Sequence, residues 1–259
     1  MITQPALDQW RTQVPWTAPD IVEQDLVLSR LIVEIANHPL LGDELVFRGG
    51  TCFHKVWLDR PWRYSEDLDY VRRTGGGVER VLDALREVGD AVGFDRATTD
   101  VRRHPKIRLF SSFRSGEQMS IKIEMNTFER SPAQSITKVA YQVDNDWFTG
   151  EADVATFALE ELVATKIRAL YQHRKGRDLF DMWLAVEEAN LAPEAIGAAF
   201  EPYRPEGWTH RLALENLAAK LDDTRFTTDL DTLVVDWPDR YTIEAGAAVA
   251  EAIIAAVSH

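Results

Sequence analysis

Apolar residues recur along the first half of the chain with two different periods. A spacing of three and four residues predicts helices over 20–37 and 78–93. Alternating or short continuous apolar runs predict strands. These strands span 45–47, 67–73, 106–114 and 118–128. A shorter helix is expected over 51–58, directly after Gly49 and Gly50.

The second half of the chain has a different pattern, because strand signals fade after about residue 150. Helical periodicity instead covers 157–173, 177–189, 209–220 and 243–257. We therefore predict an α+β protein in two parts. A mixed β-sheet flanked by helices forms residues 1–150, and an all-α part forms residues 151–259.

Composition and charge narrow the class of protein. The chain has 259 residues, 45% of them apolar and 27% charged, which is typical of a globular protein. No apolar run approaches the length of a membrane span, so no membrane association is expected. Cys52 is the only cysteine, which excludes an internal disulfide and favours a reducing cytoplasm.

The net charge of −13 argues against general affinity for nucleic acids. Two segments, 102–108 and 166–177, contain basic residues and no acidic ones. They form either a local basic groove for a nucleotide or an RNA end, or solvated helix and loop surfaces.

The segment FRGGTCFHKVWLDRPWRYSEDLDYV contains two aspartates inside a predicted strand. Alternation places Asp67 and Asp69 on one face, about 6.5–7 Å apart, and Leu68 on the other. Neighbouring carboxylates disfavour each other's ionisation unless a cation lies between them. Oxygen ligands of this kind suit Mg²⁺. The alternative is a strand with a solvated face and no ligand.

The strand over 118–128 also has a polar face, formed by Lys122, Glu124 and Asn126. Glu124 is a candidate for the third carboxylate of a cluster that holds two metal ions. Its position is equally explained by an ordinary solvated strand face.

Gly49 and Gly50 separate a strand from a helix, which allows backbone amides to approach a phosphate closely. The Thr51 hydroxyl either contacts that phosphate or caps the helix. Ser65 lies two residues before Asp67 and either touches a phosphate or forms part of a turn. The order of glycines, helix and D-x-D predicts a triphosphate cradle beside a metal site.

A lysine interrupts the apolar stripe of the helix over 157–173. Lys166 projects among Leu162, Val163 and Leu170. It must pair with an anion, extend its ammonium to solvent, or lose its proton. Asp178 and Asp181 follow on the next helix. Asp178 is stabilised at a helix start without any function, and Asp181 is expected on a solvated surface.

These motifs resemble a known group of enzymes. Gly-Gly, a helix and D-x-D in this order are similar to the nucleotidyltransferase superfamily that includes DNA polymerase β. The sequence FRGGTCFHKVW…RYSEDLDY resembles one branch of this superfamily, the AbiEii/MenT-type nucleotidyltransferase toxins of bacterial toxin–antitoxin systems. The matching positions of this first motif are Arg48, Gly49, Gly50, Thr51, Lys55, Ser65, Asp67, Leu68 and Asp69.

A second motif, KIRAL…RKGRDLFD, is similar to the family's C-terminal lysine and Arg-Asp-x-x-Asp element. The resemblance, over about residues 45–185, implies that Lys166 binds the nucleotide and that Asp178 supports the active site. Asp181 is the other candidate. The third acidic group therefore stays open between Glu124, Asp178 and Asp181.

The resemblance implies a nucleotidyltransferase-like fold and a reaction. An NTP donates its nucleoside monophosphate to an acceptor hydroxyl, with Mg²⁺ bound by Asp67 and Asp69. The implied acceptor is the 3′ end of tRNA, whose modification blocks translation, and a cognate antitoxin restrains the enzyme. The alternatives are nucleotidylation of a protein or a small molecule, and a non-catalytic nucleotide-binding partner of an antitoxin.

Overall fold

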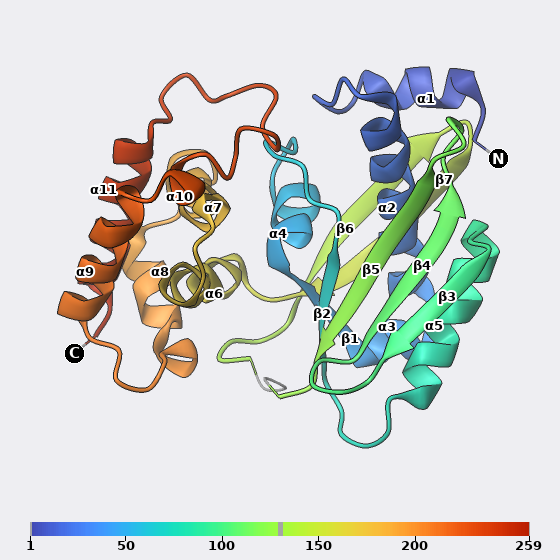
Figure 1. Ribbon diagram of the computed structural model, residues 1–259. Coiled ribbons are helices and arrows are strands. Elements are labelled where there is room, and N and C mark those ends of the chain that lie inside the picture. Colours follow the sequence, from blue (N-terminus) through green and yellow to red (C-terminus); the bar gives the residue numbers. More distant parts are fainter. Residues whose placement is uncertain (1, 129–131, 259) are drawn as a thin grey trace. The chain divides into compact units, whose positions relative to one another are not determined.

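A computed structural model of the chain describes residues 2–128 and 132–258. The chain divides into two compact units, whose elements Figure 1 labels. The first lies within residues 1–132 and 136–157, and the second within 133–135 and 158–259. The domain boundary predicted after residue 150 lies inside a strand of the first unit, β7 (Phe148–Thr156).

The first unit is built on a seven-stranded sheet with the order β3-β4-β5-β2-β1-β7-β6. The other strands are β1 (Leu45–Arg48), β2 (Leu68–Arg72), β3 (Arg96–Asp100), β4 (Lys106–Ser112), β5 (Gln118–Asn126) and β6 (Thr137–Asn145). The sheet is mixed, because β2–β5 and β1–β7 are parallel pairs and the remaining pairs are antiparallel. The predicted fold class, α+β with a mixed sheet, is confirmed.

Within its described residues, the first unit also contains five α-helices. They are α1 (Gln4–Arg11), α2 (Pro19–Asn37), α3 (Pro39–Glu44), α4 (Gly49–Cys52) and α5 (Glu79–Val92), with a π-helix, η1 (Phe53–Trp57), after α4. Leu109 of β4 contacts Gly89 of α5, and Leu109 lies opposite Ile121 of β5 in the register. The side of the sheet that carries Ile121 is therefore the core side.

Alternation along the central strands then fixes the opposite side. Leu68, Ile121 and Ile123 are fully buried on the core side. On the opposite side, Asp69 of β2 and Ser120, Lys122, Glu124 and Asn126 of β5 are only partly buried. The sheet thus presents a polar face at its centre, and this face carries the predicted carboxylates.

The predicted strands in the first 128 residues are confirmed within a few residues at each end. Three strands were not predicted: β3, β6 and β7. In β6, the first six residues alternate only between half-buried and exposed positions, so the sequence carries no strong apolar period. Edge position explains this weak pattern for β3 and β6, because an edge strand buries less of its surface.

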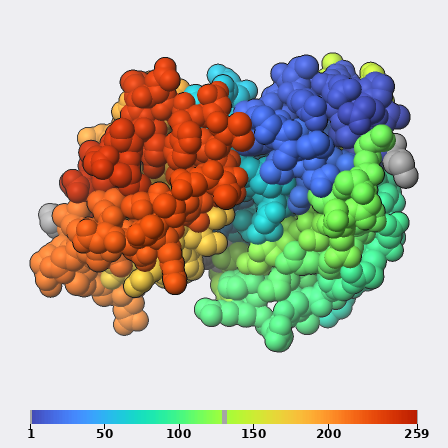
Figure 2. Space-filling model, turned by 45° about the horizontal axis from the view of Figure 1, so that its top comes forward, coloured from blue at the N-terminus to red at the C-terminus, as the bar shows by residue number. Residues whose placement is uncertain are grey.

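The second unit is all-α over its described residues. Its helices are α6 (Leu159–Gln172), α7 (Gly176–Glu187), α8 (Pro193–Ala199), α9 (His210–Leu221), α10 (Thr224–Thr227) and α11 (Ile243–Ala256), with a 3-10 turn, η2 (Glu201–Tyr203). Its core contains an aromatic cluster in which Tyr241 stands edge-on to Phe180 and Trp183, with ring centroids 4.7 and 5.3 Å apart. The last helices form part of this unit's surface in Figure 2, coloured orange to red.

The short segment 133–135 belongs to the second unit because of one buried acid. Glu161 of α6 is fully buried, and its two carboxylate oxygens accept the backbone N–H groups of Ala133 and Gln134 at 2.6 and 2.9 Å. The Tyr203 hydroxyl donates to the same carboxylate. Among the described residues, no helix combines the length and the apolar character needed to cross a membrane.

Candidate functional site

The two aspartates of the D-x-D motif lie at the start of β2. Leu68 and Tyr70 point into the core, with exposed fractions of 0% and 4%. Asp67 and Asp69 are half-buried on the opposite, polar face. The strand is short and its neighbours are fixed by hydrogen bonds, so the two carboxylates have a defined position at the centre of the sheet.

The parallel pairing of β2 with β5 brings a third carboxylate to this face. Asp69 lies directly opposite Glu124 in the register. Lys122 extends its ammonium between the acids, with Nζ 2.9 Å from Asp67 Oδ2 and 3.5 Å from Glu124 Oε2. We call Asp67, Asp69, Lys122 and Glu124 the sheet cluster. Of the open choices for the third acid, Glu124 is the one that lies in the same unit as Asp67 and Asp69.

The sheet cluster carries surplus negative charge. Burial and then the charge of Asp67 raise the pKa of Asp69, although Lys122 and Arg48 act in the opposite direction. Burial lowers the pKa of Lys122, but its hydrogen bond and ion pair with Asp67 outweigh burial, so this pKa lies above its ordinary value. The ammonium is therefore charged, and it does not fully compensate the three acids.

The glycine turn lies directly against this cluster. Gly49 has a φ of +83°, a conformation that favours glycine, and begins α4 immediately after β1. A Cβ at this position would lie 2.7 Å from Asp69 Oδ2, well inside van der Waals contact. The absence of a side chain allows the helix start and the carboxylate to approach each other.

Gly50 is confined from another side. A Cβ there would collide with the guanidinium of Arg63, which is 2% exposed and donates to the Tyr64 carbonyl at 3.2 Å. The sequence analysis did not identify Arg63, because the loop sequence gives no sign that this arginine is buried.

The hydroxyl of Thr51 is engaged within the protein. Thr51 is 1% exposed, and its Oγ1 donates to the Asp67 carbonyl at 2.5 Å and lies 2.8 Å from Ser65 Oγ. The predicted capping role is not seen, because no side chain caps α4, and the phosphate contact stays a prediction. Thr51 instead joins the helix start to the loop that positions Asp67.

Lys55 anchors η1, the helical segment that follows α4, to the core. Its Nζ lies 2.8 Å from Asp25 Oδ1 and 2.9 Å from Ser29 Oγ, both on α2. The second oxygen of Asp25 accepts the Trp10 indole N–H at 3.0 Å. Burial lowers the pKa of Lys55, and the charge of Asp25 outweighs it and leaves this pKa raised. Lys55 therefore holds the segment after the glycines onto the core.

The sheet cluster fits a divalent cation by its chemistry. It offers carboxylate oxygens, which Mg²⁺ prefers, and burial together with the charge of Asp67 raises the pKa of Asp69. Over residues 2–128 and 132–258, no three His, Cys, Asp or Glu side chains converge as a ready ligand set. The Lys122 ammonium lies between two of the acids.

The second unit holds the other predicted motif as a buried ion-pair triad. Lys166 Nζ lies 3.2 Å from Asp178 Oδ1 and 2.8 Å from Asp181 Oδ2. The three residues are 8%, 6% and 1% exposed. We call them the helix triad. The lysine thus pairs with anions rather than extending to solvent. The expectation that Asp181 lies on a solvated surface is wrong, because α6 packs against α7 and supplies its partner.

The basic run over 166–177 is largely matched by acids. Besides Lys166, Arg177 Nη2 lies 2.9 Å from Asp229 Oδ1, and Arg174 Nη1 lies 3.3 Å from Asp223 Oδ2. These ion pairs offset part of the positive charge of this run, and the basic groove stays a prediction. These partners lie some fifty residues further along the chain, where local sequence gives no sign of them.

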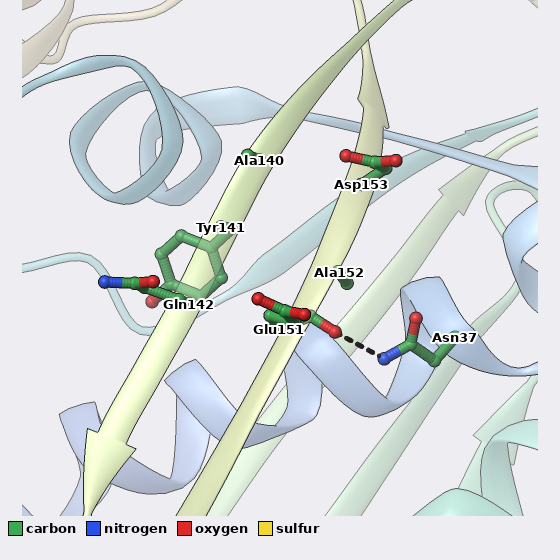
Figure 3. A pocket seen from close by; sticks show the side chains of 7 residues that line it. All are labelled: Asn37, Ala140, Tyr141, Gln142, Glu151, Ala152 and Asp153. Carbon is green, nitrogen blue, oxygen red and sulfur yellow. Dashed lines mark hydrogen bonds between the residues drawn. The ribbon is translucent and has the colours of Figure 1, made fainter.

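A separate hollow lies at the β6 and β7 side of the sheet (Figure 3). It is lined by Asn37, Tyr141, Gln142, Glu151 and Asp153, with two alanines. The Asn37 amide donates to the Glu151 carbonyl at 2.8 Å. The lining contains two acids and no basic side chain, so it does not suit a phosphate.

The sequence matches the family model of the nucleotidyl transferase AbiEii toxin of type IV toxin–antitoxin systems over residues 30–237. The match covers the glycine turn, the sheet cluster and the helix triad. The chain belongs to the AbiEii family of nucleotidyltransferase toxins. It is accordingly a nucleotidyltransferase of the toxin–antitoxin class. No curated protein sequence matches it significantly.

Solved structures share the fold of this AbiEii-family chain at low sequence identity. JHP933 from Helicobacter pylori has a TM-score of 0.60 and 13% identity, over 93% of this chain and 92% of that one. The nucleotidyltransferase toxin MenT4 from Mycobacterium tuberculosis H37Rv has a TM-score of 0.58 and 16% identity, over 99% and 89%. At these identities the likeness concerns the fold.

Proposed function

We propose that this AbiEii-family protein is a Mg²⁺-dependent enzyme that transfers a nucleoside monophosphate from an NTP to the 3′-terminal hydroxyl of tRNA. The observation that carries the proposal is the face shared by Asp67, Asp69 and Glu124 beside the start of α4 at Gly49. Acidic oxygens and a close-approach glycine turn are the two parts that phosphoryl transfer from a nucleotide requires.

The reaction exchanges one bond at phosphorus for another. The acceptor oxygen forms a bond to the α-phosphorus. The bond from that phosphorus to the oxygen that bridges the α- and β-phosphates breaks, and pyrophosphate leaves with the electrons of that bond. The hydroxyl proton passes to a carboxylate, for which Glu124 and Asp178 are the candidates. Since charge develops on phosphate oxygens, catalysis rests on positioned cations and backbone dipoles.

The proposed roles follow from place and chemistry. Asp67 and Asp69 hold the Mg²⁺, which would neutralise phosphate oxygens and orient the α-phosphorus. The backbone amides of Gly49, Gly50 and Thr51 receive the triphosphate, and Ser65 supports this loop through Thr51. Arg48 adds positive charge near Asp69. Lys166 stays a predicted nucleotide ligand, although within its own unit it is held by two aspartates.

The acceptor and the biological role are inferred from the family. Extension of tRNA ends would block translation in the cytoplasm, and a cognate antitoxin would restrain the enzyme. The single cysteine, which is buried, fits a reducing compartment.

The test is incubation of the full chain with total tRNA, Mg²⁺ and each α-labelled NTP in turn. We expect label in the tRNA band with the wild type and none with Asp69→Asn. Asp144→Asn, an exposed carboxylate on β6, is the matched control and should behave as the wild type. Label on the protein or on a small molecule would replace tRNA as the acceptor. Binding of NTP with no label anywhere would contradict the catalytic proposal.

A further inference from the structure

Lys122 places a positive charge among the acids of the sheet cluster. Its ammonium contacts Asp67 at 2.9 Å and Glu124 at 3.5 Å, and its charge also acts on Asp69. The proposed function gives two of these acids to Mg²⁺. The ammonium is paired with Asp67, one of the two acids proposed to hold Mg²⁺, and its charge acts on Asp69, the other, so the binding of the two cations must be linked.

The side chain of Lys122 is less confined than that of Lys55. It is 22% exposed, and its partners Asp67 and Glu124 are 39% and 31% exposed. Lys55 gives the contrast within the same unit, since it is 7% exposed against an aspartate that is 2% exposed. The four-carbon stem of a lysine lets the ammonium swing several ångströms without any backbone change.

The charged groups that neighbour Lys122 on β4 are basic, so a bound nucleotide would offer its ammonium a new anionic partner. On β4, Arg108 and Lys106 lie opposite Lys122 and Glu124 in the register, and on β1 Arg48 acts on Asp69. Without a ligand, the acids on β2 and β5 are the anions around Lys122. A triphosphate at the Gly49 turn would supply new anionic oxygens on the same face.

We propose that Lys122 is a resident counter-cation that makes metal binding depend on the nucleotide. This inference rests on the proposed function. In the free protein the ammonium pairs with Asp67 beside Asp69, so it lowers the affinity of these two acids for a divalent cation. When metal and NTP bind together, the ammonium leaves the acids and pairs with the triphosphate. Lys122 therefore opposes the metal alone and favours the metal with its nucleotide.

This role predicts two effects of opposite sign for Lys122→Met. Affinity for a divalent cation alone should rise about three- to tenfold, as expected when a partly exposed ammonium is removed from beside these carboxylates. Affinity for the NTP in saturating metal should fall by a similar factor. A purely structural lysine would move both affinities downward or neither.

The experiment titrates Mn²⁺, as a paramagnetic substitute for Mg²⁺, into the full-length protein and follows free Mn²⁺ by electron paramagnetic resonance. The sheet site is defined as the binding that Asp67→Asn removes. Binding of a non-hydrolysable α,β-methylene NTP in saturating Mg²⁺ is then measured by calorimetry. Lys122→Gln serves beside Lys122→Met, Lys122→Arg retains the charge, and Lys138→Met on β6 is the exposed control.

The expected result is tighter Mn²⁺ binding and weaker analogue binding for both neutral variants, with Lys122→Arg and Lys138→Met close to the wild type. Unchanged or weaker Mn²⁺ binding in both neutral variants, with a wild type that does bind Mn²⁺ at this site, overturns the role of Lys122 and leaves the proposed function intact. Absence of Mn²⁺ binding at this site in the wild type and in both neutral variants overturns the proposed metal site itself.

Discussion

The sheet cluster and the helix triad use the same residue types in opposite ways. In the sheet cluster, three half-buried acids face one lysine whose side chain is 22% exposed. In the helix triad, one lysine meets two aspartates, and all three residues are less than 9% exposed. The first arrangement carries surplus charge on an accessible strand face. The second is closed by the packing of α6 against α7.

This contrast separates a half-exposed group of charges from a buried group whose charges compensate one another within its own unit. In a buried ion pair the two charges compensate each other, and removal of one partner leaves the other charge buried without compensation. A half-exposed group of acids keeps its repulsion until a cation arrives. The four predictions below test whether the two clusters really differ in this way.

The largest effect is expected at the sheet cluster. Asp69→Asn should lower nucleotidyl transfer by about a hundredfold or more, since a group that positions charge in the transition state is lost. The same change should raise the thermal unfolding midpoint at pH 7 by a few degrees. Calorimetry and the labelled-NTP assay on one preparation measure both.

The sign of that stability gain follows from the raised pKa of Asp69. A folded state that binds its proton more tightly than the unfolded state loses stability as the pH rises above the ordinary pKa of 3.8. The gain from asparagine should therefore be present at pH 7 and absent below pH 3.8. A loss of stability at pH 7 would mean that the carboxylate is stabilised in the fold and carries no surplus charge.

Lys166→Met should have the opposite signature at the helix triad. Removal of one partner from a buried ion pair costs about 3–5 kcal/mol of unfolding free energy. Urea unfolding followed by tryptophan fluorescence measures this loss, and Lys175→Met, an exposed neighbour, is the control. If Lys166→Met proved as mild as Lys175→Met, the triad would be an open ligand site like the sheet cluster.

Gly49→Ala tests how closely the glycine turn approaches the acids. Both the φ of +83° and the 2.7 Å contact with Asp69 oppose a methyl group. Backbone strain of this kind costs about 1–3 kcal/mol, and displacement of Asp69 should lower transfer in addition. Gly116→Ala is the matched control, because its φ is +90° but a Cβ there would meet no atom within 4 Å.

Backbone strain affects both Gly49→Ala and Gly116→Ala, whereas contact with the Asp69 carboxylate affects only Gly49→Ala. Urea unfolding and the transfer assay, run on both variants, separate the two contributions. Equal losses of stability and of activity at residues 49 and 116 would mean that contact with Asp69 contributes nothing to the effect of Gly49→Ala.

The smallest effect concerns Lys220, which lies near the triad. Burial lowers its pKa to about 8, although the charge of Asp178 opposes this, and its ammonium donates to the carbonyls of Leu170 and Tyr171 at the end of α6. Between pH 8 and 10.5 the unfolded chain binds more protons at this residue. Its contribution to stability should therefore rise with pH in this window.

Urea unfolding at several pH values from 8 to 9.5 measures this slope, and Lys220→Met should flatten it. The window ends below the ordinary tyrosine pKa of 10, so tyrosine ionisation does not obscure the result. An identical slope in the variant would exclude Lys220 as its source.

Local pattern determined the parts of this protein that depend on near neighbours in the chain. The alternation in DLDYVRR put Asp67 and Asp69 on one face, because successive side chains of a strand point to opposite sides. The glycine pair and the following helix were equally clear. The family resemblance rested on these same segments, and the match over residues 30–237 confirms it.

Tertiary structure decided which charges meet. The pairing of β2 with β5 placed Lys122 and Glu124 beside aspartates more than fifty residues earlier, and the packing of α6 on α7 gave Asp181 its lysine. Strand order and helix packing depend on the burial of apolar surface over the whole unit, which no local period encodes. The sequence by itself therefore named most of the charged groups, and only the fold determined which of them compensate one another.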